Sequence, residues 1–416
     1  MLQTLAGFFD STFHSLKVKN FRTFFIGQCV SLTGTWMQRT AEIWLVYTLT
    51  KSPFLVGLFG VCQFLPMLVL SLFVGVLIDR FPKRELLLAT EFLFMAQAAA
   101  MTILTYTHLI RYWQLLILAV IFGIAQTINL PTRQAFFYEL VGQDEIANAV
   151  SLNSAITNLA KMTGPAISGL VLATLGTVFC FFANTVSFLA VIVSILFIHV
   201  GPQYQVIRNS GQKLHIIANV GAGLRYIASS ETLLLNTLIF GVVSTFAMNN
   251  EVVIPIFASA VLHRGAGGYT GLMTAAGLGA FLGALTIAFL SKSGVHRQLL
   301  VIGTVATSLL QIATVLTHSY AVSLVLLTGV GFINLIIIPT VNSTYQIYSS
   351  NEYRGRVLSV YSLLNQGSTP LGNFLAGTVM ESIGGDSGFV FCGLSTLVLI
   401  APIVFWKRRA IAAWFK

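Results

Sequence analysis

The sequence predicts an all-α membrane protein with twelve transmembrane helices arranged as two related six-helix halves. The 416 residues are 56% hydrophobic and only 9% charged, and the mean hydropathy is +0.84. This composition leaves too little polar surface to cover a water-soluble protein of this size. Apolar runs of about 20 residues, the length that crosses a bilayer, recur along the chain. The chain also repeats itself at an offset of half its length.

Apolar runs bounded by turn residues and charges mark the expected helices. In the first half they cover 21–49, 53–78, 86–107, 113–138, 146–175 and 178–199. In the second half they cover 232–262, 268–290, 298–318, 321–347, 354–382 and 387–406.

The longest polar stretch, 200–231, divides the chain into an N-terminal bundle at 1–199 and a C-terminal bundle at 232–416 with a short tail. Within this linker, the section from Lys213 to Ile227 alternates apolar and polar residues at helical spacing. Such spacing is typical of a helix that lies in the membrane interface. We therefore expect a cytoplasmic linker with an interfacial helix.

Basic residues are concentrated on one side of the predicted topology. Of the 23 Lys and Arg residues, only Lys51, Arg111 and Arg264 fall in loops on the outer side. Because cytoplasmic loops carry the excess of Lys and Arg, both termini are expected in the cytoplasm. The net charge of +10 comes as short clusters and not as one basic face, so we expect contacts with lipid headgroups and no nucleic-acid partner.

The sequence carries no pattern of an enzyme or a metal site. Its four cysteines, Cys29, Cys62, Cys180 and Cys392, lie singly in apolar segments, without CxxC spacing. HExxH and GxSxG motifs are also missing from the sequence. We expect no disulfide, metal, cofactor or catalytic residue.

The internal repeat aligns 123–176 with 331–384 without a gap. Proline and glycine, which seldom coincide by chance, fall on each other: Pro131 on Pro339, and Gly164 on Gly372. The offset is half of the chain, so we expect two structurally similar halves, as in many transporters.

The loop after the second predicted helix resembles a signature of the major facilitator superfamily. Gly75, Asp79, Arg80, Lys83 and Arg84 fall on the conserved positions of its GxxxDRxxRR motif. Gly75 allows close contact between helices, and Asp79 can accept hydrogen bonds at a helix N-terminus or pair with a cation. The resemblance implies a conformational latch.

Arg133, near the inner end of the fourth predicted helix, is expected to take part in the Asp79 network. Contact with substrate is the alternative role that we consider for this residue.

The fifth predicted helix is similar to the antiporter signature GxxxGPxxGG of the same superfamily. Gly164, Pro165 and Gly169 match the signature, whereas Ala160 and Ser168 replace two of its glycines. Small residues let helix backbones approach closely, so tight packing against a helix of the other half is an alternative to a direct role in antiport.

Longer stretches resemble the branch that includes macrolide efflux proteins and enterobactin exporters. They are Gly34–Gln38, Trp44–Tyr47, Gln63–Pro66, Leu130–Ala135 and Arg354–Val357. The resemblance implies the major facilitator fold and secondary active export of a drug-like small molecule or a siderophore, with proton antiport. An importer or facilitator of a small metabolite is the alternative. We expect a monomer in the bacterial inner membrane.

Polar residues recur along one face of the first predicted helix. Gln28, Ser31, Thr35, Gln38 and Glu42 follow one another at steps of three and four. This spacing predicts that they line a water-filled substrate cavity together with neighbouring Arg39; contact between helices is the alternative.

Two intramembrane carboxylates, Glu42 and Glu251, occupy nearly equivalent places in the two halves. A carboxylate in a desolvated cavity can take up a proton, so both are candidates for proton coupling. Asn249 and Asn250, next to Glu251, are expected at the cavity. A fixed pair between Glu42 and Arg39 is the alternative.

Three further charged residues lie in predicted spans. Lys161 is either paired across helices or a site for an anionic substrate group. Glu91 and Glu381 are expected to reach the membrane interface without a special role.

Overall fold

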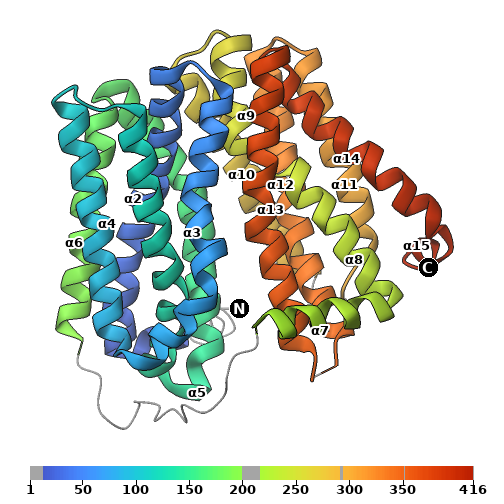
Figure 1. Ribbon diagram of the computed structural model, residues 1–416, viewed down its shortest axis with the longest axis horizontal. Helices are drawn as coiled ribbons and strands as arrows, with labels where there is room; N and C mark the ends of the chain where they lie inside the picture. The colour runs from blue at the N-terminus through green and yellow to red at the C-terminus, as the bar shows by residue number, and fades with distance from the viewer. Residues whose placement is uncertain (1–12, 199–215, 291–293, 351, 416) are drawn as a thin grey trace, which may run out of the picture. The chain divides into compact units, whose positions relative to one another are not determined.

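The structure, a computed structural model, describes residues 13–198, 216–290, 294–350 and 352–415 (Figure 1). Within these ranges, every regular element is a helix. The first part of the chain contains η1 (His14–Lys17), α2 (Lys19–Thr50), α3 (Pro53–Arg80), α4 (Lys83–Tyr106), α5 (Tyr112–Thr174) and α6 (Thr177–Phe197).

The second part of the chain begins with α7 (Ile216–Ser229) and a broken helix. This helix consists of α8 (Glu231–Val242), η3 (Val243–Ala247), α9 (Asn250–Ile256) and η4 (Phe257–Val261). The remaining elements are α10 (Ala266–Leu290), α11 (Gln298–Leu316), α12 (Tyr320–Tyr348), α13 (Arg354–Ile383), α14 (Ser387–Trp406) and α15 (Arg408–Ala412).

The chain forms two compact units. The first comprises Met1–Glu42 and Leu65–Lys213, and the second comprises Ile43–Phe64 and Leu214–Lys416. The segment 43–64, which we expected in the N-terminal half, therefore packs within the second unit. The ring of Trp44 stacks on that of Tyr269 at a centroid distance of 5.6 Å. The division of the sequence into bundles at 1–199 and 232–416 stays a prediction.

Nine helices among the described residues are long and apolar enough to cross a membrane. Helix α5 has 63 residues and is kinked at Gly142, so each of its two parts is long enough to cross the roughly 30 Å hydrocarbon core of a bilayer. Helices α2 and α13 are the least apolar of the long helices and are not among the nine. The number of twelve spans stays a prediction.

The predicted loop between the fourth and fifth helices is a kink within α5. Gly142 has φ 74° and ψ −174°, a conformation that glycine adopts readily and residues with a Cβ rarely do. The helical turns resume directly after it. The sequence thus predicted both helices but not the short, partly helical connection.

The predicted helix at 232–262 is broken near its middle. The π-helical segment η3 ends at Ala247, and α9 begins at Asn250. Asn249 stabilises this break, because its side-chain Nδ2 donates hydrogen bonds to the carbonyl oxygens of Thr245 (2.8 Å) and Phe246 (3.0 Å). Breaks and π-turns of this kind are frequent at functional sites.

A helix, α7, is present where we expected the interfacial helix, and it lies across one end of α13 (Figure 1). Its place in the membrane interface stays a prediction. The rings of Tyr226 and Tyr353 stack at a centroid distance of 4.5 Å, and the Ser350 backbone N–H donates to the Tyr226 hydroxyl at 3.0 Å. Hydrogen bonding by Ser350 lowers the pKa of the Tyr226 phenol from its ordinary value. Helix α7 is therefore anchored to the second unit.

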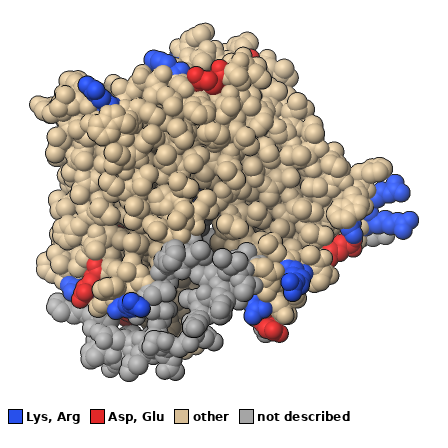
Figure 2. All heavy atoms as spheres, in the orientation of Figure 1, with Lys and Arg blue, Asp and Glu red and all other residues tan. Residues whose placement is uncertain are grey.

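The helix surfaces are apolar over a wide band. Figure 2 shows charged side chains on the visible face only toward the ends of the helices, with uncharged residues between them. Large apolar side chains are exposed on many helices, among them Leu170, Phe197 and Val325. An exposed apolar band bounded by charges is the surface of a protein that spans a bilayer.

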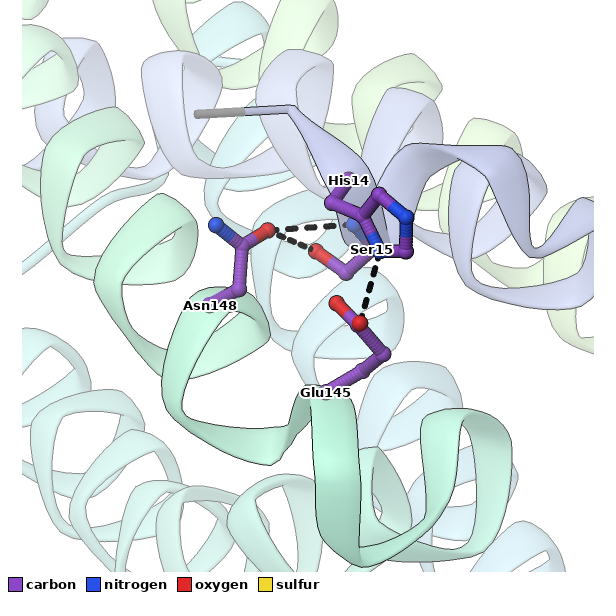
Figure 3. A network of polar contacts seen from close by, with 4 residues as sticks. All are labelled: His14, Ser15, Glu145 and Asn148. Carbon is purple, nitrogen blue, oxygen red and sulfur yellow. Dashed lines mark hydrogen bonds and ion pairs between the residues drawn. The ribbon is translucent and has the colours of Figure 1, made fainter. Parts of the chain in front are cut away.

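The N-terminal turn η1 is held against α5 just after the Gly142 kink (Figure 3). The Asn148 Oδ1 accepts hydrogen bonds from the Ser15 backbone N–H (3.1 Å) and the Ser15 hydroxyl (2.6 Å). The His14 Nδ1 lies 2.6 Å from Glu145 Oε1. These contacts attach the start of the described chain to the turn that joins the two parts of α5.

Asn148→Ala should release this turn, because it removes the acceptor of both Ser15 hydrogen bonds. Each bond contributes about 1 kcal/mol, so the loss of both should make tryptic cleavage after Lys17 in the purified protein about 30-fold faster. The matched control is Asn158→Ala, which alters an exposed asparagine of the same helix. Equal cleavage rates in both variants would show that Asn148 does not hold η1.

Candidate functional site

Glycines let α2 approach α6 closely. A Cβ atom on Gly27 would lie 2.7 Å from Ser194 Oγ, and one on Gly34 would lie 2.5 Å from Ser187 Oγ. Any larger residue at these positions would push the helices apart. The close approach brings Gln38, one turn beyond Gly34, to the side chain of Asn184 on α6.

The antiporter-like segment of α5 packs against α2. A Cβ atom on Gly164 would lie 2.5 Å from Trp36 Cβ and 3.0 Å from the Met37 nitrogen, and Pro165 is buried beside it. We had expected Gly164 to face a helix of the other half, but its close contact is with α2 in the same unit. Gly169 is half-buried, and its packing role stays a prediction.

The internal repeat reappears in this packing. Gly372, the counterpart of Gly164, lies against the carbonyl oxygen of Thr245 in the second unit. Thr245 follows Met37 by the same half-chain offset that separates the two glycines. Each unit therefore contains the same contact between equivalent helices, which supports the interpretation of the sequence as a duplication.

Glu42 lies in a buried cluster of amide side chains. Its carboxylate oxygen Oε1 accepts hydrogen bonds from Gln38 Nε2 (2.8 Å) and Gln97 Nε2 (3.2 Å). Gln38 also donates to Gln97 Oε1 (2.9 Å) and accepts from Asn184 Nδ2 (2.7 Å). Only 2% of Glu42 is exposed. The side chains that donate hydrogen bonds to the Glu42 carboxylate, those of Gln38 and Gln97, are thus both neutral amides.

The polar face of α2 is mostly buried within the first unit. Gln28, Ser31, Gln38 and Glu42 are all buried, and only Thr35 is half-buried. Gln28, Gln38 and Glu42 bond to polar side chains of α4, α5 and α6. These bonds fit the alternative of a contact between helices, and the substrate cavity along this face stays a prediction.

A second buried polar cluster, which we call the Glu91 cluster, consists of Gln28, Thr90, Glu91, Asn129 and Arg133. The Asn129 Nδ2 donates to Glu91 Oε1 and to Thr90 Oγ1, both at 2.9 Å. The Arg133 Nη1 donates to Gln28 Oε1 at 3.0 Å. The cluster joins α2, α4 and α5.

One expectation about this cluster was wrong: Glu91 does not reach the membrane interface, since only 2% of it is exposed. Arg133 is 7% exposed and donates to Gln28 in the interior of the first unit. Its part in the Asp79 network stays a prediction, because the side chain of Asp79 lies outside the described residues. The spacing of Asn129 and Arg133, four residues apart and thus on one helix face, is the signal that could have located the cluster.

Two of the predicted cavity cations lie over one aromatic ring. The Arg39 guanidinium and the Lys161 ammonium are 5.2 Å and 5.3 Å from the centroid of the Trp36 ring. Lys161 is exposed, whereas Arg39 and Trp36 are half-buried. The structure therefore brings Arg39 and Lys161 together, although they are far apart in sequence.

The predicted residues of the second half lie at the helix break. Asn249 is buried, and besides its backbone contacts its Nδ2 lies 3.7 Å from Cys392 Sγ. Asn250 is half-buried, and its Oδ1 has no hydrogen-bond partner among the described residues. Glu251 is half-buried in the first turn of α9. Glu42 and Glu251 belong to different units, so their relation stays a prediction.

The latch-like loop is described in part. The surroundings of Gly75 and the side chain of Asp79 lie outside what the structure describes, and Arg80 is exposed. Lys83 Nζ is 3.5 Å from Glu139 Oε1 on α5. The Arg84 guanidinium donates to the carbonyl oxygens of Ile195 (3.1 Å) and Leu196 (3.0 Å), at the end of α6. The basic residues thus tie α4 to its two neighbours.

Glu381, which we expected to be exposed without a role, caps the start of α3. Its Oε2 accepts hydrogen bonds from the Ser52 hydroxyl (2.8 Å) and the Phe54 backbone N–H (3.3 Å). The first N–H groups of a helix have no partner within the helix, so such a cap stabilises the helix end. All these residues belong to the second unit.

Glu381→Ala should loosen the first turn of α3, because the loss of a helix cap costs about 1 kcal/mol. Hydrogen exchange of the amides of residues 54–56 should become faster. Glu352→Ala, which alters an exposed glutamate just before α13, should leave these amides unchanged. If Glu381→Ala did not affect their exchange, the carboxylate would not act as a cap.

The comparison with protein families decides the classification. A family described as transmembrane secretion effectors matches residues 10–413, nearly the whole chain. The chain belongs to this family. The resemblance to the major facilitator superfamily and its exporters is thereby confirmed.

Relatives of this secretion effector have names that refer to transport or efflux. The staphyloferrin A transporter of Staphylococcus aureus is 22% identical over 93% of this chain and 96% of its own length. The multidrug efflux pump Tap of Mycolicibacterium fortuitum is 25% identical over 88% of this chain and 90% of its own. Macrolide efflux protein A of Streptococcus pyogenes is 23% identical over 38% of this chain and 39% of its own.

Solved structures show the same fold at low sequence identity. A POT family transporter in complex with 5-aminolevulinic acid has a TM-score of 0.72 at 12% identity, covering 94% of this chain and 96% of the other. The nucleoside transporter NupG has a TM-score of 0.70 at 12% identity, covering 95% and 99%. The secretion effector thus has the fold of multi-pass membrane transporters.

Proposed function

We propose that the secretion effector exports a drug-like small molecule or a siderophore across the bacterial inner membrane in exchange for protons. Membership of the family of transmembrane secretion effectors supports export as the direction of transport. The relatives named for siderophore transport and drug efflux support these two cargo classes. The protein acts as a monomer among membrane lipids, with both termini in the cytoplasm.

Proton exchange is supported by the environment of Glu42. The hydrogen-bond partners of Glu42 are neutral amides, and a buried carboxylate is costly when charged, so it gains stability from binding a proton. The charge of Arg39 acts on the carboxylate and offsets part of this cost. Gln38 and Gln97 hold the carboxylate in place in either state, because Oε1 can accept their hydrogen bonds with or without the proton. Glu251 is the corresponding candidate in the second half.

Candidate cargo contacts are proposed in each unit by itself: the Trp36 ring with Arg39 and Lys161 in the first unit, and Asn249 and Asn250 at the helix break in the second. An aromatic face and cations recognise planar and anionic groups, respectively. The Asp79 loop is proposed to act as a latch that shifts the balance between conformations and does not contact cargo.

Direction and coupling can be tested in living cells. Metabolites inside and outside the cells are compared in a strain that lacks the protein and in one that produces it. We expect at least one compound whose extracellular share rises with the protein, and this rise should disappear when a protonophore collapses the proton gradient. Equal ratios for every compound, or a higher intracellular share in the producing strain, would contradict export.

A further inference from the structure

The Glu91 cluster has an arrangement that differs from a fixed ion pair. The side chains of Glu91 and Arg133 are both buried, and in the part of the chain that the structure describes they form no direct ion pair with each other. Instead, Asn129 donates to Glu91 Oε1 and Gln28 accepts from Arg133 Nη1. Among the described residues, Glu91 Oε2 and Arg133 Nε have no hydrogen-bond partner. Each of the two charged groups thus has one polar atom that is buried between the helices without a hydrogen-bond partner among the described residues.

An unpartnered polar atom in a buried site is costly, and more so when its group is charged. The cost falls if a proton binds to the free carboxylate oxygen, or if the carboxylate moves onto the guanidinium. Arg133 lies close enough for its charge to act on the Glu91 carboxylate. The pocket therefore suits two states, a protonated Glu91 apart from Arg133 and an ionised Glu91 paired with it.

We propose that Glu91 binds and releases a proton in a pocket that it shares with Arg133, as a protonation site separate from Glu42. As a step of transport, this role rests on the proposed proton exchange. As a property of the pocket, it is independent of the cargo.

The fold does not require polar residues at this place. Asn129 and Arg133 lie within the internal repeat, and their counterparts in the second half are Ile337 and Val341. Both counterparts are buried in a hydrophobic core. The same helix therefore packs well with apolar side chains, which argues against a purely structural reason for the buried charges.

Arg133 is the charged residue next to Glu91, because the other charged residues of the surrounding helices contact different groups. Helix α6, which packs against α4, contains no charged residue. Helix α2 contributes the neutral amide of Gln28, and Glu42 bonds to Gln97, six residues further along α4. Lys83 and Arg84, at the start of α4, contact Glu139 and the end of α6 instead.

The pocket also adjoins a point where α5 can bend. Pro131 lies between Asn129 and Arg133 and removes one backbone hydrogen bond of the helix. Pairing of Glu91 with Arg133 would move the turn that follows this proline. The rings of Phe24 and Phe136, about one helical turn from Gln28 and Arg133 in sequence, pack edge to face at a centroid distance of 5.6 Å.

Infrared spectroscopy of the full-length protein in lipid vesicles can test this inference without a substrate. The C=O stretch of a protonated carboxyl group is followed as the pH is raised. We expect one titrating band that is lost in Glu91→Gln and retained in Glu85→Gln, a control at an exposed glutamate of the same helix. A band pattern in Glu91→Gln identical to that of the parent would overturn the proposal.

Arg133→Gln provides a second test that keeps Glu91 in place and does not depend on the folding of Glu91→Gln. Without the cation, the Glu91 band should persist to a pH about one unit higher or more. An unchanged titration midpoint would show that Arg133 is not the partner and overturn the shared pocket. If the parent protein failed to transport in response to a pH gradient, the proposed antiport would fail, whereas the infrared result would still decide the role of Glu91.

Discussion

Glu42→Gln should abolish transport driven by a pH gradient and leave the exchange of labelled for unlabelled cargo intact. The substitution preserves the shape of the side chain and an oxygen that accepts the bonds from Gln38 and Gln97. It removes the group that binds the proton. Exchange requires the alternating motion but no net movement of protons, so it should continue at the parent rate.

The comparison is made in reconstituted vesicles with the parent protein, Glu42→Gln and the exposed control Glu85→Gln. Glu251→Gln and the double variant with Glu42→Gln are measured in parallel. If Glu42→Gln, Glu251→Gln and the double variant all kept gradient-driven transport at the parent rate, neither carboxylate would be the coupling site. Loss of both exchange and gradient-driven transport in Glu42→Gln would indicate a structural role for this cluster.

Gly164→Leu should prevent the first unit from assembling. The added side chain would begin 2.5 Å from Trp36 Cβ and 3.0 Å from the backbone nitrogen of Met37. Backbone cannot give way as a flexible side chain can, so the overpacking should cost about 3 kcal/mol or more. The displacement would also disturb Arg39, which lies over the Trp36 ring.

Assembly is measured as the monodisperse fraction in size-exclusion chromatography of detergent extracts. Ala166→Leu, two residues further along α5 at an exposed position, should elute as the parent does. A Gly164→Leu protein with the parent's elution profile and transport rate would refute the close contact between α2 and α5.

Much of the architecture follows from residues that act locally. Apolar runs predicted the long helices, and the amphipathic spacing of the linker predicted α7. The repeat, identified from matched Pro and Gly residues, predicted equivalent packing in the two halves, as Gly164 and Gly372 show. These features depend on sequence neighbours or on fixed offsets, which are visible without a structure.

The partners of polar residues could not be predicted in the same way. The spacing of Gln28, Gln38 and Glu42 shows that they share a helix face, but not whether water or another helix covers it. Glu91 and Arg133 are on different helices, and only the packing of α4 on α5 brings them together. The glycines that set the distance between α2 and α6 decide which amides reach Glu42.

The break in the predicted helix at 232–262 had a weaker sequence signal. Asn249 and Asn250 were noted for their polarity and not as helix breakers. Asn249 can replace backbone partners with its side chain, which makes the break stable. The polar pair within an apolar run thus coincides with the break in the helix.

The most direct test of proton-coupled export uses everted membrane vesicles, whose lumen corresponds to the outside of the cell. The probe is the compound whose extracellular share falls in the strain without the protein. We predict that an acidic lumen drives its accumulation above the equilibrium level, and that a protonophore or a reversed gradient abolishes this accumulation. Equal levels with and without the gradient, or accumulation only when the lumen is alkaline, would contradict the account.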